Sequence, residues 1–256
     1  VECNQYLKFG EFYKKAEELG CEYIATGHYA KVEFNEKYNQ MVLRKSNASG
    51  KDQSYVLYSI SKELLDHILF PLDNFENKEQ IREIARNHNL PIADKPDSED
   101  ICFIPDGNYK AFLENNSDIS ETPGNIVTSS GKILGTHNGL YKYTIGQRKG
   151  LGISHSCPLF VIRFNKEKNE LIVGEEHELY KKDFYITNFN SLVNQFPFDT
   201  EIDVKIRYAA KPAKARLIFE NSKIHVILNE PQKSITPGQS AVFYDGNIVL
   251  GGGKIL

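Results

Sequence analysis

The sequence has no tryptophan, a single methionine and no apolar run long enough to cross a membrane as a helix. A membrane-spanning helix needs about 20 consecutive apolar residues, so the sequence predicts no membrane partner. No secretory signal peptide is visible at its start. Neither sign of charge dominates, because the net charge is only -3. This balance excludes a protein that is basic throughout, although it leaves room for a local basic face. Together these absences predict a cytoplasmic protein.

Cysteines are also few: Cys3, Cys21, Cys102 and Cys157. None forms a Cys-x-x-Cys pair and their spacings do not suit a structural zinc site, so no tightly bound metal is predicted. Four cysteines are too few for a disulfide scaffold in a chain of 256 residues. Cys21 opens an apolar stretch, where a cysteine usually fills the core. Cys3 and Cys102 lie among polar residues, and we predict that these two thiols act together on one substrate.

Cys102 follows the acidic run Asp97-Ser98-Glu99-Asp100 and a turn-like Lys95-Pro96, so we expect it on a loop or at the start of an element. A cysteine nucleophile or sulfur carrier must be accessible and must reach the thiolate form. The neighbouring carboxylates oppose ionisation unless a helix N-terminus, a cation or a ligand compensates. The alternative is a surface cysteine without function, and it applies to Cys3 as well.

The chain begins with α/β patterns. Apolar residues at helical spacing predict a helix over 5–20 that Gly20 ends, and residues 21–26 predict a short buried strand before the loop Gly27-His28-Tyr29. Helix, strand and glycine-led loop make half of an α/β unit, whose functional edge is the carboxyl end of the strand. Further predicted elements are a hairpin over 32–44 and helices over 62–69, 78–89 and 107–114, with a capping box formed by Asn77 and Gln80.

After residue 158 short strands follow one another without helices, which predicts a small β-barrel or sandwich at the C-terminal end. The predicted strands are 159–164, 170–173, 201–208, 215–220, 223–228, 240–244 and 247–251. Segment 205–216 carries five cations, and strand alternation places Lys205 and Arg207 on one face with Ile206 and Tyr208 on the other. A basic, aromatic face suits a phosphate backbone. The alternative is a solvated edge strand that its charges protect from aggregation.

Three weaker signals remain open. The loop 146–152 holds three glycines and two adjacent cations, so it is either an anion-binding loop or a tight turn with solvated charges. His28 is either a ligand-facing residue at a strand end or a structural histidine. The cluster Lys51-Asp52-Gln53 follows a flexible loop and by itself indicates only solubility.

The order of the motifs is more specific than any one of them. They are Cys3-Asn4 with Lys8-Phe9, then residues 23–29 (YIATGHY), 51–55 (KDQSY), 98–104 (SEDICFI), 143–152 (YTIGQRKGLG) and 236–244 (TPGQSAVFY). In this order the chain resembles the tRNA-specific 2-thiouridylases, the MnmA/TrmU family, which place sulfur on C2 of the wobble uridine, U34.

The resemblance implies an α/β plus β architecture in three parts. These are the C-terminal part of a PP-loop ATP-pyrophosphatase domain of Rossmann-like type over 1–105, a small central domain over 106–186, and a tRNA-binding β-barrel over 187–256. It also implies a sulfurtransferase that uses ATP, with Mg²⁺ expected, to adenylate the uridine. A persulfide on Cys102 then delivers sulfur to C2 as AMP leaves. Cys3 attacks the persulfide, so that a Cys3–Cys102 disulfide can form.

The resemblance assigns further residues and partners. Gly27 matches a position in the ATP pocket. Positions that match tRNA contacts are His28, Lys51, Asp52, Gln53, Arg207, Tyr208 and Gln239. The partners implied are tRNAs with a modifiable wobble uridine, such as the Lys, Glu and Gln acceptors, and a cysteine desulfurase or sulfur-relay protein as persulfide donor.

One departure from the family pattern concerns the start of the chain. The family's Ser-Gly-Gly-x-Asp-Ser loop, which holds the ATP phosphates, would lie before Val1, as would an acidic residue three positions before Cys3. We therefore expect that the chain as given cannot adenylate uridine. Two other function classes stay open: an RNA-binding module without chemistry, and a thiol redox sensor that uses Cys3 and Cys102.

Overall fold

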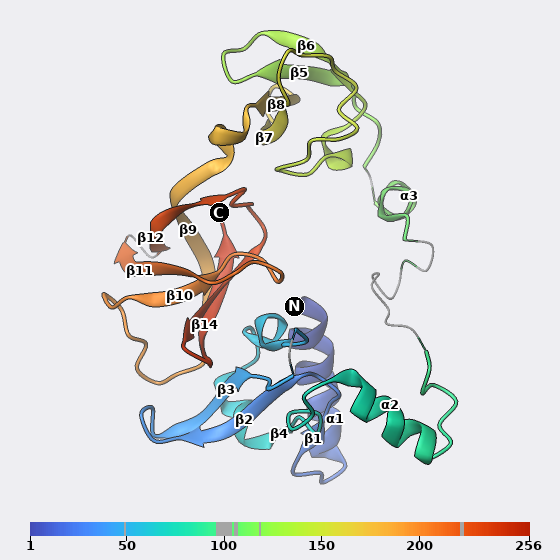
Figure 1. The fold of residues 1–256 in the computed structure, drawn as a ribbon, viewed down its shortest axis with the longest axis vertical. Coiled ribbons are helices and arrows are strands. Elements are labelled where there is room, and N and C mark those ends of the chain that lie inside the picture. The colour runs from blue at the N-terminus through green and yellow to red at the C-terminus, as the bar shows by residue number, and fades with distance from the viewer. Residues whose placement is uncertain (49, 96–103, 105–106, 118, 221–222) are drawn as a thin grey trace. The chain divides into compact units, whose positions relative to one another are not determined.

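The computed structural model describes residues 1–48, 50–95, 104, 107–117, 119–220 and 223–256. The chain divides into two compact units, each built from separate stretches of sequence (Figure 1). The first unit comprises Val1–Asp94, Lys182–Glu230 and Thr236–Leu256, and the second comprises Lys95–Lys181 and Pro231–Ile235. The predicted domain boundaries after residues 105 and 186 stay predictions. Within the described ranges no helix is both long and apolar enough to cross a membrane.

The first unit begins with the predicted helix, which consists of two consecutive segments of different helix type. The π-helix η1 (Cys3–Glu11) continues into the α-helix α1 (Phe12–Glu18), and Phe9 and Ala16 are its buried residues together with Asn4. The helix ends at Glu18, and Gly20 follows it with a φ of 74°, in the left-handed region that glycine tolerates.

The strand after this helix is shorter than predicted. Strand β1 (Ile24–Ala25) pairs in parallel with β4 (Ile68–Leu69). Cys21 is therefore exposed rather than part of the core. It lies in the turn that follows Gly20, before the buried strand begins. The predicted helix over 62–69 is also shorter, because the 3-10 helix η3 (Lys62–His67) gives way to β4.

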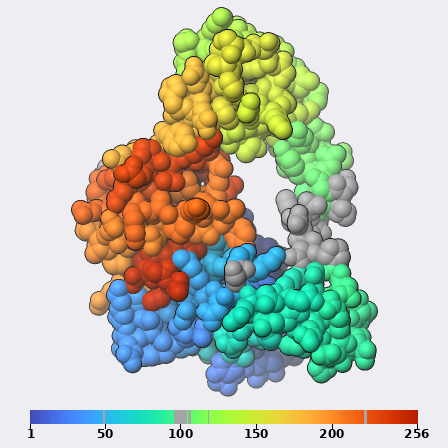
Figure 2. All heavy atoms as spheres, in the orientation of Figure 1, coloured from blue at the N-terminus to red at the C-terminus, as the bar shows by residue number. Residues whose placement is uncertain are grey.

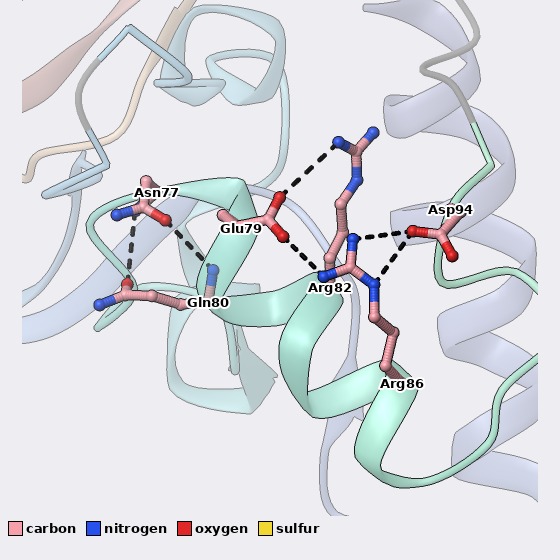
Figure 3. Close-up of polar contacts among 6 residues, drawn as sticks. All are labelled: Asn77, Glu79, Gln80, Arg82, Arg86 and Asp94. Carbon is pink, nitrogen blue, oxygen red and sulfur yellow. Dashed lines mark hydrogen bonds and ion pairs between the residues drawn. The ribbon is translucent and has the colours of Figure 1, made fainter.

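Helix α2 (Lys78–Asn87) confirms its predicted start (Figure 3). The Asn77 side chain accepts from the Gln80 N–H at 3.1 Å, and the Gln80 side chain accepts from the Asn77 N–H at 3.5 Å. At the other end Arg86 pairs with Glu79 at 2.7 Å and with Asp94 at 2.8 Å. These ion pairs are exposed, so each contributes at most about 1 kcal/mol.

The C-terminal strands of the first unit form a closed barrel, as predicted. Its six strands are β9 (Tyr180–Ser191), β10 (Ile202–Lys205), β11 (Ala213–Glu220), β12 (Lys223–Lys233), β13 (Ser240–Asp245) and β14 (Ile248–Ile255). They follow the order β13-β10-β11-β12-β9-β14, and the pairing of β14 with β13 closes the ring.

The barrel and the N-terminal segment share one sheet and one core. The hairpin of β2 (Ala30–Asn35) and β3 (Gln40–Lys45) joins the barrel where β3 pairs with β14. Figure 2 shows this hairpin, in blue, directly against red atoms of the barrel. The shared core packs Leu43 and Tyr55 against Val242, Tyr244 and Val249.

Strand β14 contains three consecutive glycines because other backbone segments approach it closely. Gly251 has a φ of 145°, and a Cβ built on it would overlap the Asn190 carbonyl oxygen. The Asn190 amide in turn donates to the carbonyls of Tyr58 at 2.7 Å and Ile60 at 2.8 Å. This contact therefore fastens the N-terminal segment to the barrel.

The second unit has a four-stranded sheet in the order β6-β5-β8-β7. Its elements are α3 (Tyr109–Asn116), β5 (Gly124–Thr128), β6 (Ile133–His137), η4 (Leu140–Lys142), β7 (Phe160–Asn165), β8 (Glu170–Gly174) and η5 (Glu176–Leu179). Its core contains Ile126, Leu159, Val161, Leu171 and Val173.

Candidate functional site

Asp52 shapes the loop that carries the predicted cluster Lys51-Asp52-Gln53. One of its carboxylate oxygens accepts from the backbone N–H groups of Ser46 at 3.2 Å and Ser54 at 3.1 Å. The other accepts from the Ser54 hydroxyl at 2.9 Å. A charged acceptor with three donors holds a loop firmly. Asp52 therefore presents its neighbours Lys51 and Gln53 in a defined conformation.

Gln53 links this loop to the loop that follows β1. Its backbone N–H donates to the Tyr29 carbonyl at 2.8 Å, and its side-chain oxygen accepts from the Tyr29 N–H at 2.9 Å. Two residue groups that are far apart in sequence, 27–29 and 51–53, therefore lie side by side.

The basic segment of the barrel meets the same loop. The Lys205 ammonium lies 5.8 Å from the centre of the Tyr55 ring and 5.6 Å from that of Tyr208. Burial lowers the pKa of Lys205, and the charge of Asp52 acts in the opposite direction. Burial and Asp52 raise the pKa of Tyr208, while Lys51 lowers it. The Tyr55 and Tyr208 rings are also 6.0 Å apart, so the loop and the basic segment are close neighbours.

Tyr208 does not share a face with Ile206, so that part of the strand prediction is wrong. Strand β10 ends at Lys205, and the Ala210 N–H donates to the Arg207 carbonyl at 3.2 Å to form a turn. Ile206 stays buried, whereas Tyr208 is 45% exposed. The turn thus brings Tyr208 to the surface beside Lys205 and Arg207.

Arg207 extends this surface to Gln239. Its guanidinium donates to the Thr236 hydroxyl at 3.0 Å, and the Gln239 N–H donates to the Thr236 carbonyl at 3.2 Å. Gln239 is exposed. We refer to the surface that these contacts connect as the docking surface, which consists of Lys51, Gln53, Lys205, Arg207, Tyr208 and Gln239.

His28 lies beneath the surface rather than on it. It is 7% exposed, and its ring lies 6.0 Å from that of Phe9 and 6.1 Å from that of Phe70. Its Nδ1 atom is 2.8 Å from the Thr26 hydroxyl, and its Nε2 atom is 3.4 Å from the Lys8 ammonium. Burial, followed by the charge of Lys8, lowers the pKa of His28 to about 4. Its contact with RNA stays a prediction.

Because the pKa of His28 is lowered in the folded protein, the free energy of unfolding should decrease as the pH falls. Between its folded pKa of about 4 and its ordinary value of 6.5, the unfolded chain binds more protons than the folded one. The contribution is fully present above the ordinary value and falls by on the order of 3 kcal/mol as the pH drops towards the folded value. In urea unfolding across this range, His28→Phe should lose less stability with falling pH than the wild type. His88→Gln, at the exposed end of α2, is the control, and an unchanged pH dependence in His28→Phe would contradict the assignment.

Cys3 is exposed at the first position of η1, and the next residue anchors it. Asn4 is buried and donates to the Val56 carbonyl at 3.1 Å, which fixes the start of the helix. Cys102 lies outside the described residues, so its pairing with Cys3 stays a prediction. Cys3, Cys21 and Cys157 are free thiols. Where side chains are described, no three metal-binding residues come together.

Gly27 shows no steric need for glycine within the fold. A Cβ built on it would meet only Leu72 Cδ1, at an ordinary 3.7 Å. The predicted approach of ATP to this position is compatible with that space, although the role stays a prediction.

In the second unit, the loop 146–152 forms a closed turn. The Gln147 side chain accepts from the Thr144 N–H at 3.0 Å and donates to the Lys149 carbonyl at 2.9 Å. Nearby, the Cys157 thiol lies 3.7 Å from a Glu175 oxygen. Burial and then Glu175 raise the pKa of this thiol, which disfavours the reactive thiolate.

Asn4 and Lys8 join the site although the sequence assigned neither of them a role, and Lys205 joins it through a contact that the sequence did not predict. Asn4 and Lys8 belong to the Cys3 motif, which was the only available signal. Lys205 was recognised as part of a basic strand, but its contact with Tyr55 depends on the fold.

Comparison with known proteins covers the whole chain. Three family models match: the tRNA methyl transferase HUP domain over residues 1–106, the tRNA methyl transferase PRC-barrel domain over 110–175, and the aminomethyltransferase beta-barrel domain over 181–255. The chain is 44% identical to tRNA-specific 2-thiouridylase MnmA of Acetivibrio thermocellus over 258 residues, 46% to that of Caldicellulosiruptor saccharolyticus over 261 and 42% to that of Clostridioides difficile over 258. Each match covers 100% of this chain and 71% of the relative. The chain therefore belongs to the tRNA-specific 2-thiouridylase (MnmA) family.

Proposed function

We propose that this protein is a tRNA 2-thiouridylase, which transfers sulfur from a cysteine persulfide to C2 of the wobble uridine through an adenylated intermediate. The observation that carries the proposal is the docking surface, on which residues from the N-terminal segment and the barrel meet. Four of its residues are cationic or aromatic: Lys51, Lys205, Arg207 and Tyr208. Cations neutralise phosphates and aromatic rings stack on bases, so this combination suits single-stranded RNA such as an anticodon loop.

In the proposed reaction the two thiols act one after the other. The terminal sulfur of a Cys102 persulfide attacks C2 of the adenylated uridine, and AMP leaves with the oxygen. The Cys3 thiolate then attacks the Cys102 sulfur, and the persulfide S–S bond breaks with its electron pair on the transferred sulfur. The products are 2-thiouridine and a Cys3–Cys102 disulfide. A thiol reductant must reduce this disulfide before the next turnover.

ATP supplies the activation of the uridine oxygen in this proposal, and Gly27 would lie against it. Mg²⁺ is expected with the nucleotide. The persulfide would come from a cysteine desulfurase or a sulfur-relay protein. Wobble-uridine tRNAs for Lys, Glu and Gln are the expected substrates.

The direct test uses the intact native protein with tRNA, ATP and a persulfide-generating cysteine desulfurase. Nucleosides are digested and 2-thiouridine is measured by mass spectrometry. Product that requires ATP would support the proposal. RNA binding without product would favour the second candidate, a non-catalytic RNA-binding module, because the docking surface would then act without the thiols.

Removing one cation tests the docking surface separately. We expect Arg207→Ala to weaken binding of an anticodon stem-loop RNA and to lower the slope of log K against log salt by about one unit. The measurement is fluorescence anisotropy over a range of salt concentrations. Arg216→Ala, an exposed arginine on β11, is the matched control. Arg216→Ala should keep the wild-type slope, and if Arg207→Ala keeps it as well, Arg207 is not a phosphate contact.

A further inference from the structure

Lys8 is held over His28 but has no role in the proposal above. Its ammonium lies 3.4 Å from His28 Nε2, at the long end of a hydrogen bond. An ammonium group has donors and no acceptor, so Nε2 must provide the lone pair. The hydrogen of the neutral imidazole then lies on Nδ1 and donates to the Thr26 hydroxyl at 2.8 Å. The contacts therefore define one tautomer of His28.

The geometry of η1 brings Lys8 to the side of Cys3. In an α-helix, successive residues are about 100° apart, so a residue five positions on lies far round the axis. In a π-helix the residues i and i+5 are hydrogen-bonding neighbours along the axis. This pattern is present in η1, whose following residue Phe12 donates its N–H to the Leu7 carbonyl. Lys8 therefore lies one turn beyond Cys3.

Lys8 also differs from the other lysines of this helical segment. Lys14 pairs with Glu11 at 2.8 Å and Lys15 with Glu18 at 2.6 Å. No carboxylate of the described residues lies within 4 Å of the Lys8 ammonium. A neutral histidine thus orients this cation without neutralising it, and no carboxylate in the described ranges does so either.

We propose that Lys8 contacts a phosphate of the bound RNA next to the base that Cys3 serves, and that His28 is the residue that positions Lys8. This inference rests on the proposed function and adds a contact near the Cys3 thiol by a residue that is not part of the docking surface. The two residues have different roles in this proposal. Lys8 provides the charge that contacts the RNA, and His28 orients Lys8.

The first test measures anticodon stem-loop binding by the intact native protein at several salt concentrations. Lys8→Met keeps the length of the side chain and removes its charge, so we expect the salt slope to fall by about one unit. Lys8→Arg should retain the slope, and Lys14→Met, on the same helical segment, should not change it. His28→Phe keeps a ring between Phe9 and Phe70 but lacks Nε2, so it should weaken binding.

The double variant separates positioning from a general loss of packing. If His28 acts only through Lys8, then adding His28→Phe to Lys8→Met should weaken binding no further. Additive losses would overturn the positioning role. An unchanged slope in Lys8→Met, with a reduced slope in Arg207→Ala, would overturn the inference and leave the proposed function intact. Absence of RNA binding by the wild type would overturn both.

A second readout needs no RNA. The imidazole ¹⁵N chemical shifts of His28 distinguish the two neutral tautomers. We expect hydrogen on Nδ1 in the wild type at neutral pH. Hydrogen on Nε2 would be incompatible with donation from Lys8 and would overturn the inference.

Discussion

Replacing Cys102 by serine in the intact native protein is expected to abolish formation of 2-thiouridine while the affinity for tRNA stays unchanged. A serine hydroxyl cannot carry the transferred sulfur as a persulfide, so no partial activity should remain. The measurement is mass spectrometry of the nucleosides after reaction with tRNA, ATP and a persulfide donor, with RNA binding measured alongside. Product from Cys102→Ser would remove Cys102 from the sulfur path.

Cys3→Ser is expected to abolish the product as well, because no thiolate would then release the sulfur from Cys102. Product that survives this change alone would reduce Cys3 to an accessory role. Cys21→Ser and Cys157→Ser are matched controls and should behave as the wild type. Cys21 lies in the turn after α1, and the raised pKa of Cys157 disfavours its thiolate. A Cys3–Cys102 disulfide that forms with peroxide and needs no tRNA would favour a redox sensor instead.

The second large effect is on folding: Gly251→Ala should destabilise the first unit by about 3–5 kcal/mol. The residue has a φ of 145°, and a side chain there would overlap the Asn190 carbonyl oxygen. Strand β14 would have to move away from β9, and both the barrel closure and the Asn190 contacts depend on it. Urea unfolding followed by circular dichroism measures the loss.

Gly27→Ala is the control for this experiment. Its φ is not in the left-handed region, and the nearest atom to a new Cβ lies at 3.7 Å. Its free energy of unfolding should stay within about 1 kcal/mol of the wild type. If Gly251→Ala and the wild type have the same free energy of unfolding, then β14 can shift without loss of stability and the prediction is wrong.

Much of the fold was predictable where periodicity and local chemistry agree. The Asn77 capping box is a local pattern and is confirmed. The apolar stripe predicted for the first helix is only half right, because Phe9 and Ala16 are buried whereas Phe12 and Leu19 are exposed. Strand β9 was not predicted, because its first four residues are all exposed and show no alternation between apolar and polar side chains. Tyr208 was assigned to the wrong face because alternation was extended past the end of β10.

The sequence identified several residues of the candidate site, but it did not predict how those residues are arranged in space. The family motifs identified Lys51, Gln53 and Arg207, but not the contacts that join them. Gln53 meets Tyr29, and Lys8 meets His28, through folding of segments about 20 residues apart. Periodicity predicts which residues share a face of one helix or strand, but it does not predict contacts between separate segments.

The pairing of β3 with β14 has a consequence for synthesis on the ribosome. Arg44 pairs with Ile248, and the Lys45 N–H donates to the Asn247 carbonyl at 2.8 Å. The sheet that contains this hairpin therefore stays incomplete until β14 (Ile248–Ile255) has been translated. During that interval β3 presents an open edge and the apolar residues of the shared core lack their partners. The nascent protein should therefore depend on chaperones until β14 emerges from the ribosome.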